Sequence, residues 1–316
     1  MRHDAETRDG AAKYLLWGLG VTAAAVAGYT LFRYLGREGD VAPALGGGIY
    51  LLEGLASSPF PQQAGTGAAV VVPPGFVPSS AMRVCLYIRG FSNCVDRVVT
   101  DTDGPCSPGG ATHHASHLAT QLADSGSGTL LILPELIREV QSGDPGKLAQ
   151  AGSVNALLEE VLARMAPVLG SRTVADIAHL GVMTHSGGYQ TAAAIIRQRP
   201  AALRSVALLD SLYGNQADFA AWVAENAARF TPADGFRIAD MYTDGGGTAD
   251  KSRALAAQVR LSLAAAGAQS EFLFDDDASR TLTPQDYARH ALFKHSALSH
   301  DGTTRYYPQR LWAAGW

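Results

Sequence analysis

Charged residues are scarce in this 316-residue chain, and no stretch of it is strongly basic. Only 17% of the residues are Asp, Glu, Lys or Arg, and the net charge is −4. Proteins that bind phosphate backbones usually carry a basic domain or stripe, so we expect no nucleic-acid partner. Repeats with a period of about 20–50 residues are also absent, which argues against a solenoid or a propeller. With 47% hydrophobic residues, the chain predicts a packed globule rather than a disordered protein.

Cysteine is almost absent, with three residues in the whole chain. Cys85 lies in an apolar stretch, whereas Cys94 and Cys106 flank a loop rich in Asp, Gly and Pro. In an oxidising compartment Cys94 and Cys106 could close a disulfide, and Cys85 would stay buried as a thiol.

Patterns that bind metal ions are weak. His113, His114 and His117 form H-H-x-x-H, but no Glu stands in the general-base position of H-E-x-x-H. Asp101 and Asp103 precede a glycine, but the rest of a calcium-binding loop is missing. We therefore expect no metal ion and no other cofactor.

Near the N-terminus, nineteen successive residues between Lys13 and Arg33 carry no charge. A helix needs about 20 apolar residues to cross a bilayer, so the run predicts a transmembrane signal anchor over 14–34, after a tail over 1–13. A cleaved signal peptide has a shorter apolar region of about 7–15 residues and a nearby cleavage site, and A-P-A at 42–44 lies too far downstream. Basic residues flank both ends, and they slightly favour a cytoplasmic N-terminus. The rest of the chain is then expected on the extracytoplasmic side of the membrane.

Residues 35–67 are rich in Gly, Ala, Pro and Ser and predict a stalk. The remaining residues, 68–316, alternate short apolar runs with longer Ala- and Leu-rich helical patterns. Parallel strands need crossover connections of about a dozen residues or more, so this pattern predicts a doubly wound α/β domain with a mostly parallel sheet. Its eight expected strands lie at 68–73, 83–90, 129–136, 178–186, 205–212, 236–243, 270–276 and 290–298.

The strongest functional motif is T-H-S-G-G at 184–188, between a predicted strand and a predicted helix. A nucleophile on a sharp strand-to-helix turn needs small neighbours, because the turn is strained and closely packed. Ser186 has this position. The N–H of Gly187 lies at the start of the helix, where it can stabilise an oxyanion. A plain Ser-Gly-Gly turn without a catalytic role is the alternative.

This motif, together with the order of strands and helices over 68–316, resembles the α/β-hydrolase superfamily and the H-S-G-G form of its nucleophile elbow. Thr184 replaces the first glycine of the G-x-S-x-G pattern. The end of RVCLYIRG resembles the H-G segment of the family, which implies a second oxyanion donor near Phe91, with Arg89 in place of the usual His. The resemblance implies a serine hydrolase that cleaves a small-molecule or lipid-like carboxylic ester or amide through an acyl-enzyme intermediate.

In that superfamily the base follows the last strand, which makes His300 and His295 the candidates. We favour His300, because His295 falls within a predicted strand. The acid that orients the imidazole is Asp210 or Asp244, each at the end of a predicted strand. Most relatives carry it after the later strand, which favours Asp244, but LLDSLYG is the more distinctive segment, and we slightly prefer Asp210.

The sequence is also compatible with two other kinds of function. Because Arg89 and Thr184 depart from the family pattern, one alternative is a non-catalytic binding or assembly protein at the membrane. The same scaffold also supports haloperoxidase or transacylase chemistry, and the fold alone does not choose between them.

Overall fold

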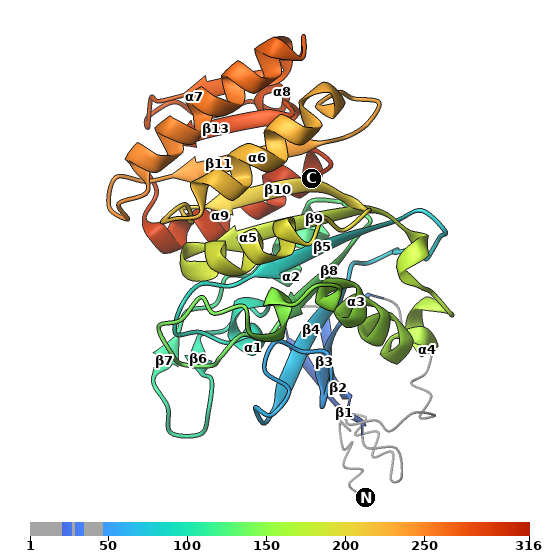
Figure 1. Ribbon diagram of the computed structural model, residues 1–316. Coiled ribbons are helices and arrows are strands. Elements are labelled where there is room, and N and C mark those ends of the chain that lie inside the picture. Colours follow the sequence, from blue (N-terminus) through green and yellow to red (C-terminus); the bar gives the residue numbers. More distant parts are fainter. Residues whose placement is uncertain (1–20, 27–28, 35–46) are drawn as a thin grey trace, which may run out of the picture.

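The computed structural model describes residues 21–26, 29–34 and 47–316 (Figure 1). Its strands are β1 Val21–Val26, β2 Tyr29–Tyr34, β3 Gly48–Glu53, β4 Thr66–Val72, β5 Met82–Ile88, β6 Gly104–Pro105, β7 Thr112–His113, β8 Thr129–Pro134, β9 Ile177–His185, β10 Leu203–Leu209, β11 Arg237–Tyr242, β12 Phe272–Asp275 and β13 Ala291–His295. The α-helices are α1 Val95–Val98, α2 Leu118–Asp124, α3 Ser153–Arg164, α4 Ala166–Leu169, α5 Tyr189–Arg197, α6 Gln216–Asn226, α7 Ala249–Ala265, α8 Pro284–Tyr287 and α9 His300–Ala313. Short 3-10 helices are η1 Gly146–Ala149, η2 Val174–Asp176, η3 Ser186–Gly188, η4 Ala227–Arg229 and η5 Gln269–Glu271.

In the described part of the chain, eleven strands form one sheet in the order β1-β2-β3-β4-β8-β5-β9-β10-β11-β13-β12. From β8 to β12 every neighbouring pair is parallel, whereas β4 runs antiparallel to both β3 and β8. The strands β6 and β7 pair separately. The predicted α/β fold with a mostly parallel sheet is thus confirmed, although the sheet is mixed and has more strands than the eight expected.

Helices cover both faces of the sheet (Figure 1). One cluster of buried apolar side chains lies between the sheet and α3, α5, α6 and α7, and a second lies between the opposite face and α1, α2 and α9. The central strand β9 is buried along most of its length, so that its residues supply both clusters in alternation. Helix α5, which follows β9, packs closely through Ala192, Ala193 and Ala194. Because all of the parallel strands end at one edge, their last residues meet in one region.

The described residues do not show the predicted spanning helix over 14–34. The structure has the strands β1 and β2 within this span; they pair antiparallel, and β2 pairs parallel with β3. The rest of the span, with the predicted tail, lies outside the described residues, at 1–20 and 27–28. No helix among the described residues combines the length and the apolar character needed to cross a membrane. An apolar run does not by itself distinguish one helix from two strands, and Thr30, Phe32 and their aromatic neighbours have a high strand propensity.

Part of the predicted stalk over 35–67 belongs to the same sheet. The strand β3 is buried and pairs antiparallel with β4. After β3 the chain packs on α3, where Glu160 accepts hydrogen bonds from the backbone N–H groups of Ala56 (2.9 Å) and Ser57 (2.7 Å). Gly- and Pro-rich composition indicates turns, but it does not reveal that the apolar segment between them pairs with a sheet.

Candidate active site

Ser186 lies on a sharp turn between β9 and α5. Its φ of 51° is in the left-handed region, which is rare for a residue other than glycine and is often found at functional turns. The glycine after it is required by close packing, because a Cβ at Gly187 would lie 1.8 Å from the ring of Phe91. A Cβ at Gly90 would lie 2.8 Å from Cβ of Ser186. The turn therefore brings Ser186 directly against the backbone that follows β5.

Thr184, which replaces the first glycine of the family pattern, is accommodated by Gly188. A Cβ at Gly188 would lie 2.3 Å from Oγ1 of Thr184, so a glycine there leaves room for the threonine. The Thr184 hydroxyl is buried 3.3 Å from Oγ of Ser211, and the Ser211 hydroxyl donates to the carbonyl of Ser186 at 2.6 Å. These contacts stabilise the turn that holds Ser186.

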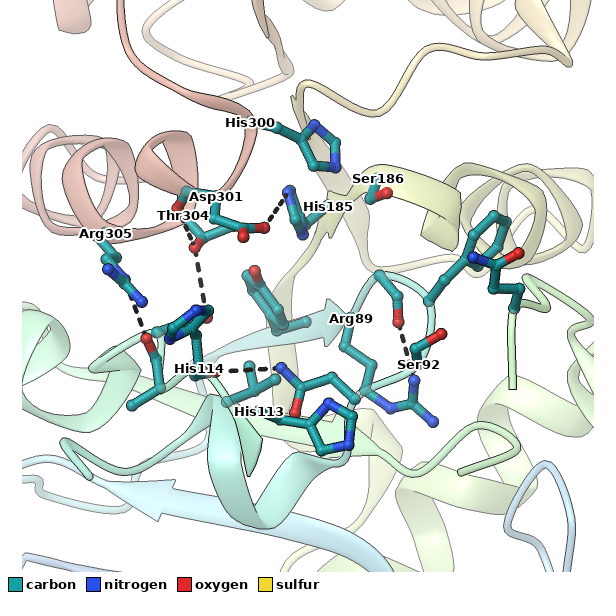
Figure 2. Close-up of a pocket in the computed structure, with 18 of the residues that line it drawn as sticks. Arg89, Ser92, His113, His114, His185, Ser186, His300, Asp301, Thr304 and Arg305 are labelled. Carbon is teal, nitrogen blue, oxygen red and sulfur yellow. Dashed lines mark hydrogen bonds and ion pairs between the residues drawn. The ribbon is translucent and has the colours of Figure 1, made fainter. Parts of the chain in front are cut away.

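His300 begins α9 and contacts Asp210, which follows β10. Nδ1 of His300 lies 2.7 Å from Oδ2 of Asp210. Asp210 has a φ of 46°, which is also in the left-handed region. With Nδ1 protonated toward the carboxylate, Nε2 of His300 is unprotonated and free to accept a proton. His300 and Ser186 line the same pocket (Figure 2).

The Asp210 carboxylate is fully buried and well supplied with donors. Oδ1 accepts from the backbone N–H of Thr243 (3.1 Å) and from the Thr248 hydroxyl, and Oδ2 accepts from the Thr243 hydroxyl (2.7 Å). Burial raises the pKa of Asp210, but the hydrogen bonds from His300, Thr243 and Thr248 outweigh burial and hold the pKa below its usual value. The group is therefore a carboxylate at neutral pH.

Asp244 and His295, the alternative acid and base, contact each other away from Ser186. Oδ1 of Asp244 lies 3.0 Å from Nε2 of His295, and 76% of the Asp244 side chain is exposed. His295 is the last residue of β13 and stacks on Tyr242, with ring centroids 5.3 Å apart. The structure thus places two His–Asp pairs at the carboxyl edge of the sheet. Only His300, the partner of Asp210, lines the pocket of Ser186.

The backbone at Phe91, the predicted second oxyanion donor, lies close to Ser186. Gly90 and Phe91 follow β5 and lie against Ser186 and Gly187, as the close approaches described above require. In the described part of the chain, no hydrogen bond engages the Phe91 N–H, whereas the N–H of Ser92 donates to the carbonyl of Val140 at 3.0 Å. The Phe91 N–H is thus free to bind an oxyanion.

Arg89 stands where the family usually has His, and its side chain binds groups within the protein. Its side chain is buried and points into the protein, where Nε donates to Oε1 of Glu135 at 2.8 Å. Its terminal nitrogens donate to the carbonyls of Gly90 (2.8 Å) and Ile137 (2.7 Å). The other oxygen of Glu135 accepts from the N–H of Val95 at 3.0 Å. This buried ion pair fixes the Gly90 loop to the end of β8.

A pocket of about 320 Å³ opens in front of Ser186. Figure 2 shows Ser186, His185 and His300 on one side of it and His113, His114 and Arg89 below, with Asp301, Thr304 and Arg305 of α9 on the other side. Most of these side chains are polar. The exposed ring of Phe91 adds an apolar surface to the lining.

His185, the residue before Ser186, also lines the pocket. The sequence alone predicts no role for it. Its ring packs against that of His300, with centroids 4.4 Å apart. Burial, followed by the charge of neighbouring His300, lowers the pKa of His185 to about 4, so the ring is neutral at pH 7. Its place in the motif is visible in the sequence, but its contact with α9 is not.

The histidines of H-H-x-x-H do not share a helix face. His113 ends β7 and His117 precedes α2. Nδ1 of His114 lies 2.8 Å from Oδ2 of Asp103, and Nδ1 of His117 lies 3.2 Å from Oδ1 of Asp101. These hydrogen bonds organise the loop beside the pocket.

The same loop is closed by a disulfide between Cys94 and Cys106, as the sequence allows. Cys85 is a buried free thiol, and burial raises its pKa to about 12. Of the three cysteines, none therefore offers a reactive thiolate to the pocket.

No family model and no curated protein matches the sequence. Solved structures do match. A serine-to-alanine mutant of the feruloyl esterase module from Clostridium thermocellum, complexed with sinapinate, superposes with a TM-score of 0.53 and 13% identity, over 88% of this chain and 92% of that chain. An S-formylglutathione hydrolase from Staphylococcus aureus gives a TM-score of 0.50 and 10% identity, over 87% and 100% of the two chains. The chain has the α/β-hydrolase fold, as the motif and element order predict.

Proposed function

We propose that the protein is a serine hydrolase that cleaves a carboxylic ester through an acyl-enzyme intermediate. The observation that carries this proposal is the 2.7 Å contact between buried Asp210 and His300 in the pocket of Ser186. An acid and a base beside a serine that lines a pocket at one edge of a sheet are the parts of an activated hydroxyl nucleophile.

In the proposed acylation, Oγ of Ser186 attacks the carbonyl carbon of the ester while Nε2 of His300 takes the hydroxyl proton. The N–H groups of Gly187 and Phe91 stabilise the oxyanion that forms. The tetrahedral intermediate then collapses, the bond to the leaving oxygen breaks, and His300 returns the proton to the leaving alcohol. Water repeats the sequence on the acyl-enzyme and releases the acid. Asp210 holds the imidazole in the tautomer that both steps need and stabilises its charged form.

The pocket supports a small ester substrate. Its volume of about 320 Å³ is at the lower end of the range of roughly 300–1,000 Å³ for small-molecule sites. The Phe91 ring offers an apolar surface next to Ser186, and the opposite side offers polar groups from His113, His114 and Arg305. Because one structural neighbour is a feruloyl esterase, ferulate esters are the first class to test, and the corresponding amides are the alternative substrates.

The test is covalent labelling. A fluorophosphonate should add to Ser186 of the purified protein, as seen by intact mass and peptide mapping, and Ser186→Ala should abolish both labelling and hydrolysis of p-nitrophenyl acetate and ethyl ferulate. Ser116→Ala, which removes another serine of the pocket, is the matched control and should still be labelled. A folded protein that takes no label and cleaves none of these esters would instead support a non-catalytic binding or assembly protein.

We also propose that the domain works in an extracytoplasmic compartment. Disulfides persist mainly in oxidising compartments, and the bond between Cys94 and Cys106 supports this location. The spanning helix over 14–34 is not part of the proposal, because the described residues of that span form β1 and β2. Fractionation of the native source, with the oxidation state of the two cysteines trapped by alkylation, tests the location.

A further inference from the structure

A second histidine and a carboxylate lie beside the proposed catalytic base. Nε2 of His185 is buried, has no hydrogen-bond partner among the described residues, and lies 4.0 Å from Oδ1 of Asp301. One ligand atom from each of His185, His300 and Asp301 lies within 4.8 Å of the others. Figure 2 shows the His185 ring between Asp301 and Ser186, below His300. The mechanism proposed above uses His300 alone of these three groups.

Two imidazoles and one carboxylate are a ligand set that Zn²⁺ prefers, with a fourth position left for water or another ligand. Zinc–ligand bonds of about 2.0–2.1 Å in a tetrahedral site place the ligand atoms roughly 3.3 Å apart. The ligand atoms therefore need to approach one another by up to about 1.5 Å. Two of them have room to do so, because 34% of His300 and 60% of Asp301 is exposed, whereas His185 is held in place with 11% exposed.

The contact that orients His300 for proton transfer also prepares it to bind a metal ion. With Nδ1 directed at Asp210, Nε2 carries the lone pair that faces the pocket. Histidine ligands of zinc commonly donate their other N–H to a carboxylate in this way, which fixes the ring and raises its basicity. The second candidate cluster in the described residues, Cys106, His113 and Glu139, lacks such preparation, because its sulfur is in the disulfide.

We propose that His185, His300 and Asp301 form a Zn²⁺ site, and that the bound ion reversibly inhibits hydrolysis by occupying Nε2 of His300. The ion takes the lone pair that would accept the Ser186 proton, so the metal-bound protein has no general base. Inhibition rests on the proposed hydrolase function, whereas the site itself does not.

Binding is measured by calorimetry with ZnCl₂ on the full-length, chelator-treated protein. We expect one high-affinity Zn²⁺ per chain, and at least about tenfold weaker binding in Asp301→Asn and in His185→Gln, since even groups behind a ligand contribute 10–100-fold. Asp301 is exposed in the first turn of α9. Asp301→Asn therefore tests the site even if His185→Gln disturbs the turn that holds Ser186. The matched control is His295→Gln, which removes the His–Asp pair outside the pocket and should bind Zn²⁺ like the wild type.

Esterase assays supply the second measurement. Zn²⁺ should inhibit the wild type, EDTA should restore the full rate, and Asp301→Asn should need at least about tenfold more Zn²⁺ for the same inhibition. The proposal is overturned if the wild type binds no Zn²⁺, or if both variants bind it as tightly as the wild type. Failure of the hydrolase function looks different: calorimetry would still report the site in a protein that cleaves no ester.

Discussion

Asp210→Asn is expected to leave a folded but nearly inactive protein, and the hydrogen bonds around Asp210 explain why. Oδ1 faces the backbone N–H of Thr243, which can only donate, so the amide oxygen of the asparagine must take this position. The NH₂ group then takes the position of Oδ2, beside the Thr243 hydroxyl and Nδ1 of His300. The hydroxyl can rotate and accept, but Nδ1 can accept only in the tautomer that carries its proton on Nε2. His300 is then protonated at the nitrogen that should receive the Ser186 proton.

The size of the effect follows from this tautomer and from the lost charge. Loss of the orienting carboxylate in a triad lowers kcat by about 10⁴, which corresponds to about 5 kcal/mol of transition-state stabilisation. The cost in folding stability is smaller, about 1–3 kcal/mol, because the asparagine keeps most of the hydrogen bonds to Thr243 and Thr248 with weaker, uncharged partners. KM should change little, because Asp210 is buried behind His300 and does not line the pocket.

The assay compares kcat of wild type, Asp210→Asn and Asp244→Asn on p-nitrophenyl acetate, with urea unfolding to show that each variant is folded. Asp244→Asn is the matched control, since it makes the same change in the exposed pair with His295, and it should retain most of the activity. If Asp210→Asn kept more than about a tenth of the wild-type kcat, or if the ranking of the variants were reversed, the tautomer argument would be refuted.

Three further variants test the fold and its electrostatics. Replacing Cys94 and Cys106 by Ser should lower the unfolding free energy by about 3 kcal/mol, the loop entropy for a separation of 12 residues, and a loss below about 1 kcal/mol in urea would contradict it. Arg89→Met should cost about 1–3 kcal/mol in the same assay, because Glu135 loses its ion pair with Arg89 and keeps only the one with Arg138; a neutral variant would show that the pair with Arg89 is not needed. Burial, followed by the charge of the neighbouring Asp210 carboxylate, raises the pKa of Asp240 to about 7. Between about pH 4 and pH 7 the folded protein therefore keeps a proton on Asp240 that the unfolded chain has lost. The unfolding free energy falls as the pH rises through this window. Asp240→Asn should match the wild type near pH 4 and exceed it by up to about 4 kcal/mol at about pH 8, and equal stability at both pH values would refute the assignment.

The sheet and the turn at Ser186 could be predicted because their signals are local. Apolar runs alternate with helical patterns along the chain, and T-H-S-G-G stands between a strand and a helix. The choice between Asp210 and Asp244 could not be made in this way, because both aspartates follow strands that end at the same edge. It depends on which strand lies next to β9 and on register: β10 is the neighbour, whereas Tyr242 at the end of β11 pairs with His295.

Hydropathy alone does not decide the structure of the N-terminal segment. An uncharged run of nineteen residues has the length of a spanning helix, and the prediction followed from that length. The structure instead has β1 and β2 at the edge of the sheet, next to β3. A run of this length is also long enough for two short strands. Whether it forms a helix or strands depends on whether another strand is available to pair with it, which the run itself does not reveal.

Each of the two departures from the family pattern is compensated by another residue of the chain, so neither argues against catalysis. Thr184 is matched by Gly188, four residues on, whose missing Cβ leaves the space that the threonine hydroxyl fills. Arg89 is matched by Glu135, which lies 46 residues away at the end of β8 and neutralises its charge within the protein. In both cases the side chain differs while the backbone keeps its place: Gly90 still lies against Ser186, and the Phe91 N–H still has no other acceptor among the described residues. Since the proposed oxyanion hole uses backbone N–H groups, a substitution that keeps the backbone in place leaves both proposed donors where they are.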